Sequence, residues 1–427
     1  MIAFILADLR RFKGGAVAVV VLIALSVALS VVVTLQERAV RLGSARAAEK
    51  FDLLVGASGS ETQLALSAVF LQPAPLPLMS GKVLEKLSGD PRVALAAPVG
   101  FGDSSFGFPI VGTTTALVSA LSPALAEGVP FARLGEAVVG ADVPMSPGAE
   151  LKPMHGTIET GGETHTEVVY RVTGRMTPTG TAWDRAILVP IRTVWELHGM
   201  GGAEEHAHEH GEEDHADGDH APEAGARERE HHHGHVDPDA ALDEHFTEDT
   251  PGVPAVLVKP KTIADAYRLR QEYRTETTLA VFPAEVLTRL YGTLGDARSL
   301  LLAIAIGTQG IVVAAILLVA IMHIGSRRRQ IGALRALGAP MRAVVWLVWG
   351  ELFLLFLAGI ILGGGLGFIV AEVVSARLTA ATAVRLPVEF SVEDMRFAVG
   401  FVITAAVVSL VPALAALRTS PAAALRS

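Results

Sequence analysis

Four apolar stretches constrain this chain more than any other feature, because each is long enough to cross a lipid bilayer. A membrane-spanning helix needs about 20 predominantly apolar residues. The stretches cover residues 16–35, 300–324, 344–370 and 397–417. The mean hydropathy of +0.44 is too high for an ordinary soluble protein and too low for a chain buried wholly in lipid. We therefore expect four transmembrane helices and a large water-exposed part.

Basic residues indicate which side of the membrane faces the cytoplasm, since they accumulate in cytoplasmic loops. They precede the first stretch, fill the segment between the second and third, and follow the fourth: Arg10, Arg11, Lys13, Arg327, Arg328, Arg329, Arg335, Arg342, Arg418 and Arg426. Four spans place all of them on one side. The prediction is a multi-pass protein of a bacterial inner membrane, with cytoplasmic segments 1–15, 325–343 and 418–427, a short outer loop 371–396 and a large periplasmic domain 36–299.

The first stretch is expected to be an uncleaved anchor. Its apolar core exceeds the roughly 7–15 residues of a signal peptide, and no cleavage site of small residues follows at the right distance.

The large domain combines strand and helix patterns. Alternating apolar and β-branched residues predict strands at 93–98, 109–112, 167–173, 186–190, 255–259 and 279–282. Helical spacing occurs at 82–87 and 263–273, so that 255–282 reads as a βαβ-type unit. The fold class predicted is a four-helix membrane protein with an α+β domain inserted between helices 1 and 2, carried on outward extensions of those helices.

One segment of this domain, 203–249, has an abnormal composition. It holds 17 acidic residues against two arginines, and ten of the 14 histidines. With so few apolar residues it is expected to be disordered without metal. Neutral imidazoles beside carboxylates suit zinc or another divalent ion, and the chain has no cysteine to supply thiolates. The candidate ligands are His206, His208, His210, His215, His220, His231, His232, His233 and His235. The alternative is a solvated acidic linker; the order typical of metallopeptidases is missing.

The most specific segment reads Ser326-Arg-Arg-Arg-Gln-Ile-Gly-Ala-Leu-Arg-Ala-Leu-Gly-Ala-Pro-Met-Arg342. A short helix over 330–337 would place Ile331, Leu334 and Leu337 on one face and end at a glycine followed by a proline. A loop that only sets topology would explain the arginines, but it would not explain this apolar face.

This segment resembles the signature of the MacB/FtsX-like, or type VII, ABC transporter permeases: a basic residue, then (E/Q)-Ile-Gly-x-Leu-Arg-Ala-Leu-Gly-Ala. Further segments are similar to family members: 51–57 after the first span, the glycine-rich third span, and 421–426 at the end. Two more, 181–185 and 195–199, resemble one bacterial subgroup.

The resemblance implies a non-catalytic subunit that works with a separate ATPase, and no phosphate-binding Gly-x-x-x-x-Gly-Lys-Ser/Thr loop occurs in the sequence. It also implies a homodimer in membrane lipid, with a possible periplasmic partner protein and no nucleic acid. ATP-driven motion would be relayed to the periplasmic domain for export or mechanotransmission. The predicted ATPase-coupling residues are Arg329, Gln330, Ile331, Leu334, Arg335, Leu337 and Gly338.

Three glycines in the third span recur every four residues: Gly359, Gly363 and Gly367. Such spacing allows two helices to approach closely in lipid, within the permease or at a dimer seam. The alternative is the general tolerance of membrane helices for glycine.

Two other functions share these features. One is a zinc-linked uptake or sensing component that uses the histidine-rich segment. The other is a signal transducer, similar to FtsX relatives, that activates a cell-wall hydrolase. The sequence does not identify the cargo, and no nucleophile–base–acid set indicates an enzyme.

Overall fold

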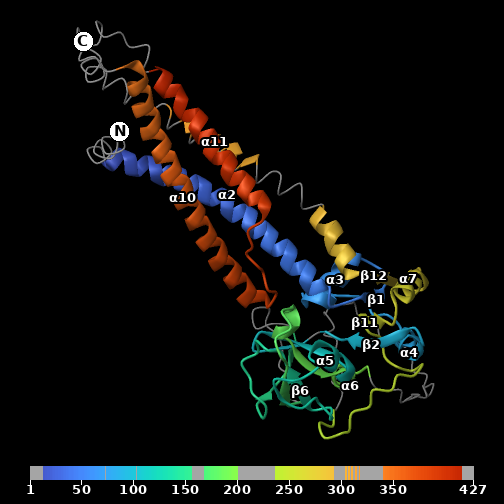
Figure 1. Cartoon of the computed structure of the whole chain (residues 1–427). Coiled ribbons are helices and arrows are strands. Elements are labelled where there is room, and N and C mark those ends of the chain that lie inside the picture. Colours follow the sequence, from blue (N-terminus) through green and yellow to red (C-terminus); the bar gives the residue numbers. More distant parts are fainter. Residues whose placement is uncertain are drawn as a thin grey trace, which may run out of the picture. The chain divides into compact units, whose positions relative to one another are not determined.

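The computed structural model describes residues 13–72, 74–101, 103–155, 168–200, 236–292 and 340–415, with short pieces between 303 and 317. The chain forms two compact units. A helical unit comprises the residues up to Ser44, Arg289–Ala381 and the residues from Arg385 onward. An outer unit comprises Ala45–Thr288 and Thr382–Val384. Both units are visible in Figure 1.

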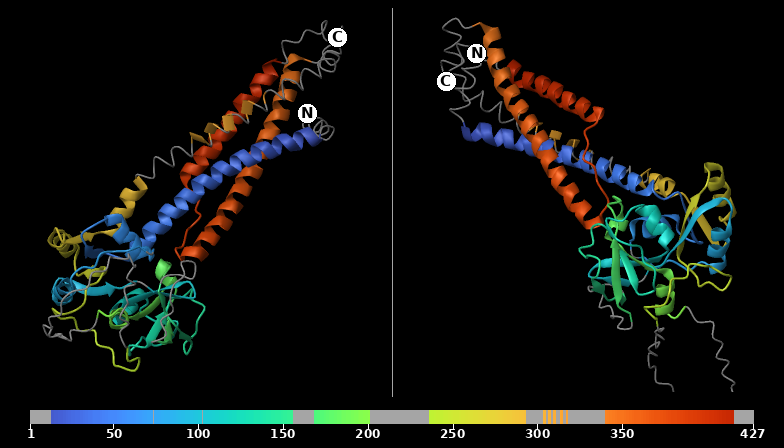
Figure 2. Two further views of the ribbon diagram at one scale, coloured as in Figure 1. Left: turned by 180° about the vertical axis from the view of Figure 1, so that it is seen from behind. Right: turned by 60° about the horizontal axis from the view of Figure 1, so that its bottom comes forward.

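The helical unit is built on three long helices: α2 (Lys13–Ala48), α10 (Met341–Thr382) and α11 (Val392–Ala415). Both views of Figure 2 show α10 crossing α2. Among the described residues, these three helices are the ones long and apolar enough to span a membrane. Together with the α+β unit inserted after α2, they confirm the predicted fold class. The second predicted span, 300–324, lies mostly outside the described residues.

The helices are longer than the apolar stretches that predicted them. α10 continues to Thr382, well into the expected loop 371–396. This part of the sequence contains no glycine or proline to stop a helix and is rich in alanine, so the helix continues past the apolar stretch.

The first sheet of the outer unit is four-stranded, with the order β12-β1-β11-β2. Its strands are β1 (Leu53–Ala57), β2 (Val93–Val99), β11 (Ala255–Pro260) and β12 (Thr278–Val281). Every neighbouring pair is antiparallel. Helices α3 (Glu61–Phe70) and α4 (Gly81–Gly89) connect β1 to β2, and α7 (Ile263–Glu272) connects β11 to β12. The predicted βαβ unit is therefore a split one, with β1 between its two strands, as in ferredoxin-like folds.

The second sheet is contributed by the long connection between β2 and β11. It is mixed and eight-stranded, and its main path runs β5-β9-β6-β10-β4-β3-β8, with β7 paired to β9. The strands are β3 (Asp103–Ser105), β4 (Phe108–Thr113), β5 (Glu127–Gly128), β6 (Glu136–Val139), β7 (Glu150–Leu151), β8 (Met154–His155), β9 (Tyr170–Arg175) and β10 (Ile187–Pro190). Around it lie α5 (Thr115–Leu121), the 3-10 helix η2 (Ala182–Arg185) and α6 (Ile191–Leu197).

The prediction of a disordered segment over 203–249 is wrong for its last part. Residues 236–249 are packed into the outer unit, where Val236 is fully buried. The backbone N–H of Leu134 donates to the carbonyl of Ala240 at 3.1 Å. The Glu244 carboxylate accepts the backbone N–H of Thr115, at the start of α5, at 2.6 Å. A few apolar residues and one helix-capping carboxylate are enough to order this stretch despite its acidity.

Candidate functional site

The glycine face of α10 lies directly against α2. A Cβ atom at Gly359 would lie 2.6 Å from the Cβ of Ile23, and one at Gly363 would lie 2.5 Å from the carbonyl oxygen of Ala24. One at Gly367 would lie 2.8 Å from a side-chain atom of the same helix. No side chain fits at these three positions, so the two backbones approach as small-residue faces allow in lipid.

Near the end of α2 that leaves the helical unit, a charged pair joins α2 to α11. The Arg38 guanidinium donates to both carboxylate oxygens of Asp394, with Nη1 to Oδ2 at 2.5 Å and Nη2 to Oδ1 at 2.9 Å. Nη1 also donates to the carbonyl of Glu389 at 3.1 Å. The two side chains are only 10% and 14% exposed. This two-pronged geometry fixes direction as well as distance.

Asp394 has a second role, because it also caps its own helix. Its carboxylate accepts the backbone N–H of Ser391 at 2.7 Å and the hydroxyl of Ser391 at 3.2 Å. A carboxylate in the first turn also interacts favourably with the helix dipole. The same side chain therefore starts α11 and holds it to α2.

The segment between α10 and α11 closes around the same part of α2. A Cβ atom at Gly43 would lie 2.5 Å from the carbonyl oxygen of Arg385, so only glycine fits there. The Ser375 hydroxyl donates to the carbonyl of Leu386. The Tyr291 hydroxyl donates to the hydroxyl of Ser44 at 2.7 Å.

We call this set of contacts the collar. It consists of Arg38, Gly43, Ser44, Tyr291, Ser375, Arg385, Leu386, Glu389 and Asp394. The collar ties α2 to α10, to α11 and to Tyr291, which precedes the second predicted span.

In the outer unit, the residues that follow α2 are anchored in a buried polar turn. The Lys50 ammonium donates to the carbonyl of Thr179 at 2.6 Å, and the Phe51 ring packs 6.1 Å from the ring of Trp183. The Asp184 carboxylate organises the turn by accepting the backbone N–H and the hydroxyl of Thr179, both at 2.7 Å. Thr179, Trp183 and Asp184 thus form a socket for the two residues Lys50 and Phe51 that follow α2, and Trp183 and Asp184 belong to the segment 181–185.

A second buried polar cluster lies deeper in the outer unit. Nε2 of His198 is 3.6 Å from Oδ1 of Asp103, and Nδ1 is 2.8 Å from the carbonyl of Val194. The Asp103 carboxylate raises the pKa of His198, against the opposing effect of burial. Burial also raises the pKa of Tyr170, whose hydroxyl has no hydrogen-bond partner in the described part of the chain.

Most of the residues predicted to carry function lie outside the described residues. This applies to the coupling segment, residues 329–338, and to all nine predicted metal ligands. Within the described ranges, no three histidine or acidic residues are grouped so that they could hold a metal ion. Of the predicted sites, only the glycine face of α10 lies within the described residues.

The collar and the socket were not predicted. Arg38 and Asp394 carry a weak signal in the sequence, because each is a charge set close to the end of an apolar stretch. Nothing in the sequence pairs them, since 356 residues separate the two.

Comparisons with known proteins bear on the membrane part of the chain. Residues 302–422 match the model of the FtsX-like permease C-terminal domain. No curated protein matches the chain.

Two solved structures are similar to part of the chain. The periplasmic region of MacB from Actinobacillus actinomycetemcomitans shares 7% identity, covers 57% of this chain and 95% of its own, and has a TM-score of 0.32. The extracellular domain of the noncanonic ABC-type transporter YknZ from Gram-positive bacteria shares 11% identity, covers 54% and 98%, and has a TM-score of 0.28. Scores this low carry no argument, so the assignment rests on the match to the domain model and on the signature at 326–342. On that basis residues 302–422 are assigned as an FtsX-like permease C-terminal domain.

Proposed function

We propose that this permease relays ATP-driven motion from a separate cytoplasmic ATPase to its outer unit, through the single helix α2. The support comes from the way in which α2 is connected to both units. α2 runs unbroken from Lys13 to Ala48, so its last turn belongs to the outer unit and its body to the helical unit. Movement of α10 or α11 acts on α2 through the glycine face and the collar. Lys50 and Phe51 then pass it to the socket.

The contacts of α2 are suited to transmission because they resist displacement in different directions. Close packing at Gly363 resists approach and sliding, since a shift of the backbone meets Ala24 at once. The ion pair of Arg38 resists separation and rotation, because its fork engages both oxygens of Asp394. The observation that carries the proposal is this double fastening of one continuous helix.

The orientation and the partners belong to the same proposal. The basic clusters favour cytoplasmic termini and a periplasmic outer unit in a bacterial inner membrane. The coupling segment around Leu334 would dock on the ATPase. A homodimer over two ATPase subunits and a periplasmic partner protein complete the assembly.

The docking step can be tested with a substitution on the apolar face of the predicted coupling helix. Leu334→Asp would place an unpaired charge in the contact and should abolish co-purification of the ATPase from mild detergent. Ala336→Asp is the matched control, because the helical period places residue 336 on the opposite side of the same predicted helix. It should retain the ATPase. Equal retention by both variants would show that this face does not dock the ATPase.

The relay itself needs a different readout. A collar variant, Arg38→Gln, should keep ATPase binding and ATP hydrolysis while uncoupling them from movement of the outer unit. The movement can be followed by a fluorophore pair on cysteines placed in this cysteine-free chain. If nucleotide-driven movement persists at full amplitude in a stably folded Arg38→Gln protein, the relay does not run through the collar.

A further inference from the structure

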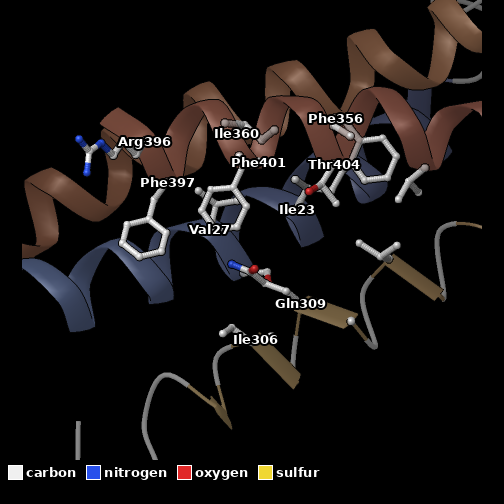
Figure 3. A pocket seen from close by; sticks show the side chains of 16 residues that line it. Ile23, Val27, Ile306, Gln309, Phe356, Ile360, Arg396, Phe397, Phe401 and Thr404 are labelled. Carbon is white, nitrogen blue, oxygen red and sulfur yellow. The ribbon is translucent and has the colours of Figure 1, made fainter. Parts of the chain in front are cut away.

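A cavity of about 480 Å³ lies inside the helical unit, between α2, α11 and the helical positions at 306–313. Its volume falls within the range of about 300–1,000 Å³ typical of ligand sites. Phe397 and Phe401 project from α11 toward Gln309, and Val27 lies on the α2 side (Figure 3). Ile360 of α10 completes the apolar lining.

The polar groups deep in the cavity are few and uncharged. The side-chain amide of Gln309 donates to the hydroxyl of Ser30 at 2.8 Å. The buried hydroxyl of Ser26 has no hydrogen-bond partner in the described part of the chain, but it is uncharged. Thr404 lies on a long helix, where a hydroxyl can bond to the carbonyl one turn back. Ser409 of α11 does this to Ala405, which is also a lining residue. The deep part of the cavity therefore suits an apolar chain.

One end of the cavity carries a positive charge. Arg396 lines the cavity from the beginning of α11, only four residues after the helix starts at Val392, and its side chain is exposed. Within the described residues no carboxylate pairs with it, in contrast to Arg38, whose carboxylate partner is Asp394. A long basic side chain near the end of a membrane helix reaches the level of the lipid headgroups, where it can pair with their phosphates.

An apolar cavity that ends in a free cation matches the chemistry of one molecule of the surrounding bilayer. We propose that this cavity binds an acyl chain of an anionic phospholipid, with the lipid phosphate paired to Arg396. The chain fills the space between Phe397, Phe401 and α2. Because both α2 and α11 line the cavity, the bound lipid contacts two of the helices that the collar joins, so that lipid composition can influence how they move.

Glycine positions in the helices provide a matched pair of variants. A Cβ atom at Gly400 would have no atom within 4 Å, and the residue lines the cavity, so Gly400→Leu fills the space without a backbone clash. Gly365 of α10 is equally open and is exposed, but it does not line the cavity. Gly365→Leu therefore changes composition and helix propensity in the same way and leaves the cavity empty for lipid.

The experiment uses the full chain in nanodiscs of phosphatidylethanolamine and phosphatidylglycerol, with a trace of phosphatidylglycerol that carries a photoreactive diazirine on one acyl chain. After irradiation, adducts are mapped by peptide mass spectrometry. Adducts at Phe397 and Phe401 should be reduced roughly tenfold in Gly400→Leu and be unchanged in Gly365→Leu. Adducts on Ile361 and Ile369, exposed residues of α10, report ordinary surrounding lipid and should stay constant in both.

The contact between the lipid headgroup and Arg396 is tested by changing the charge of the lipid and the charge of residue 396. In wild-type protein, a diazirine phosphatidylcholine should label the cavity several-fold less than the phosphatidylglycerol probe, and Arg396→Gln should remove that preference. Both probes carry a phosphate, but only phosphatidylglycerol has a net negative charge, so equal labelling by the two in wild-type protein would refute the assigned anionic lipid. Undiminished labelling in a folded Gly400→Leu protein would refute the site. A change in oligomeric state caused by Gly400→Leu, with labelling unchanged, would show that a second copy of the chain covers this face instead.

Discussion

Breaking the ion pair between Arg38 and Asp394 should destabilise the helical unit by several kcal/mol. Two unit charges about 4 Å apart attract by about 4 kcal/mol at an effective dielectric constant near 20. Since both side chains are nearly buried, removing one leaves the other uncompensated, which typically costs about 3–5 kcal/mol. Asp394→Asn is the sharper single variant, because asparagine can still cap α11 at Ser391 and so removes mainly the charge.

The loss is measurable as a shift of the thermal transition. For a unit of this size, 1 kcal/mol shifts the midpoint by roughly 2–4 °C, so Arg38→Gln and Asp394→Asn should each lower it by roughly 6–20 °C. Helical circular dichroism of the full chain in nanodiscs follows the transition. The double variant should lose clearly less than the sum of the two single losses, because the second substitution removes a charge that no longer has a partner.

A second pair on the same helix is the control. Arg41 contacts Glu37 one turn away at 3.3 Å, but the two side chains are 47% and 27% exposed. Arg41→Gln should therefore cost less than about 1 kcal/mol. Equal midpoints for the Arg38 and Arg41 variants, or strictly additive losses at Arg38 and Asp394, would refute the view that this pair holds α11 to α2.

Three further outcomes are expected. Gly363→Ala should cost roughly 1–3 kcal/mol, because its methyl group meets a backbone carbonyl, whereas Gly364→Ala, with open space around it, should be neutral or slightly stabilising in the same thermal assay. The raised pKa of His198 means that its contact with Asp103 stabilises the fold below about pH 6.5. This contribution disappears as pH rises through the pKa of the folded state. The difference in thermal midpoint between wild type and His198→Gln should therefore shrink from about pH 5.5 to about pH 9. A peptide of residues 203–235 should bind zinc near about pH 7.5 and release it toward about pH 5.5 as its imidazoles protonate, and calorimetry without any binding signal at the higher pH would remove the metal hypothesis.

The fold was predictable where a local pattern decides it. Apolar stretches such as 344–370 marked α10, because a helix of about 20 continuous apolar residues crosses the bilayer with all its backbone groups paired internally. Strand and helix patterns between 255 and 282 marked β11, α7 and β12, because burial of one face imposes a period of 2 or 3.6 residues. The insertion of β1 between β11 and β12 was out of reach, since pairing across some 200 residues leaves no local trace.

The sequence-based predictions fail where the contacts of a few residues outweigh the average composition of a segment. The average composition of residues 203–249 predicts disorder along the whole segment, although Val236 and Glu244 each make contacts that order the chain around them. The collar was missed for a related reason. An arginine beside an apolar stretch usually only marks the membrane boundary, and its carboxylate partner becomes evident only when the helices are assembled.

A relay of movement through α2 requires that this helix be stiff. Its 36 residues correspond to about 54 Å of helix, against a hydrocarbon core of about 30 Å. From residue 16 to residue 42 it contains neither glycine nor proline, the usual causes of a sharp bend. Gly43 follows, but it lies against Arg385 in the collar, which supports the backbone at the one position where the helix would otherwise yield. Gly43→Ala should therefore damage the relay, because its methyl group forces the collar open, whereas the stiffening of the helix alone would not. The loss should then appear in nucleotide-driven movement of the outer unit, with ATPase binding unchanged. Full movement in a folded Gly43→Ala protein would mean that the close contact at the collar is not needed for transmission.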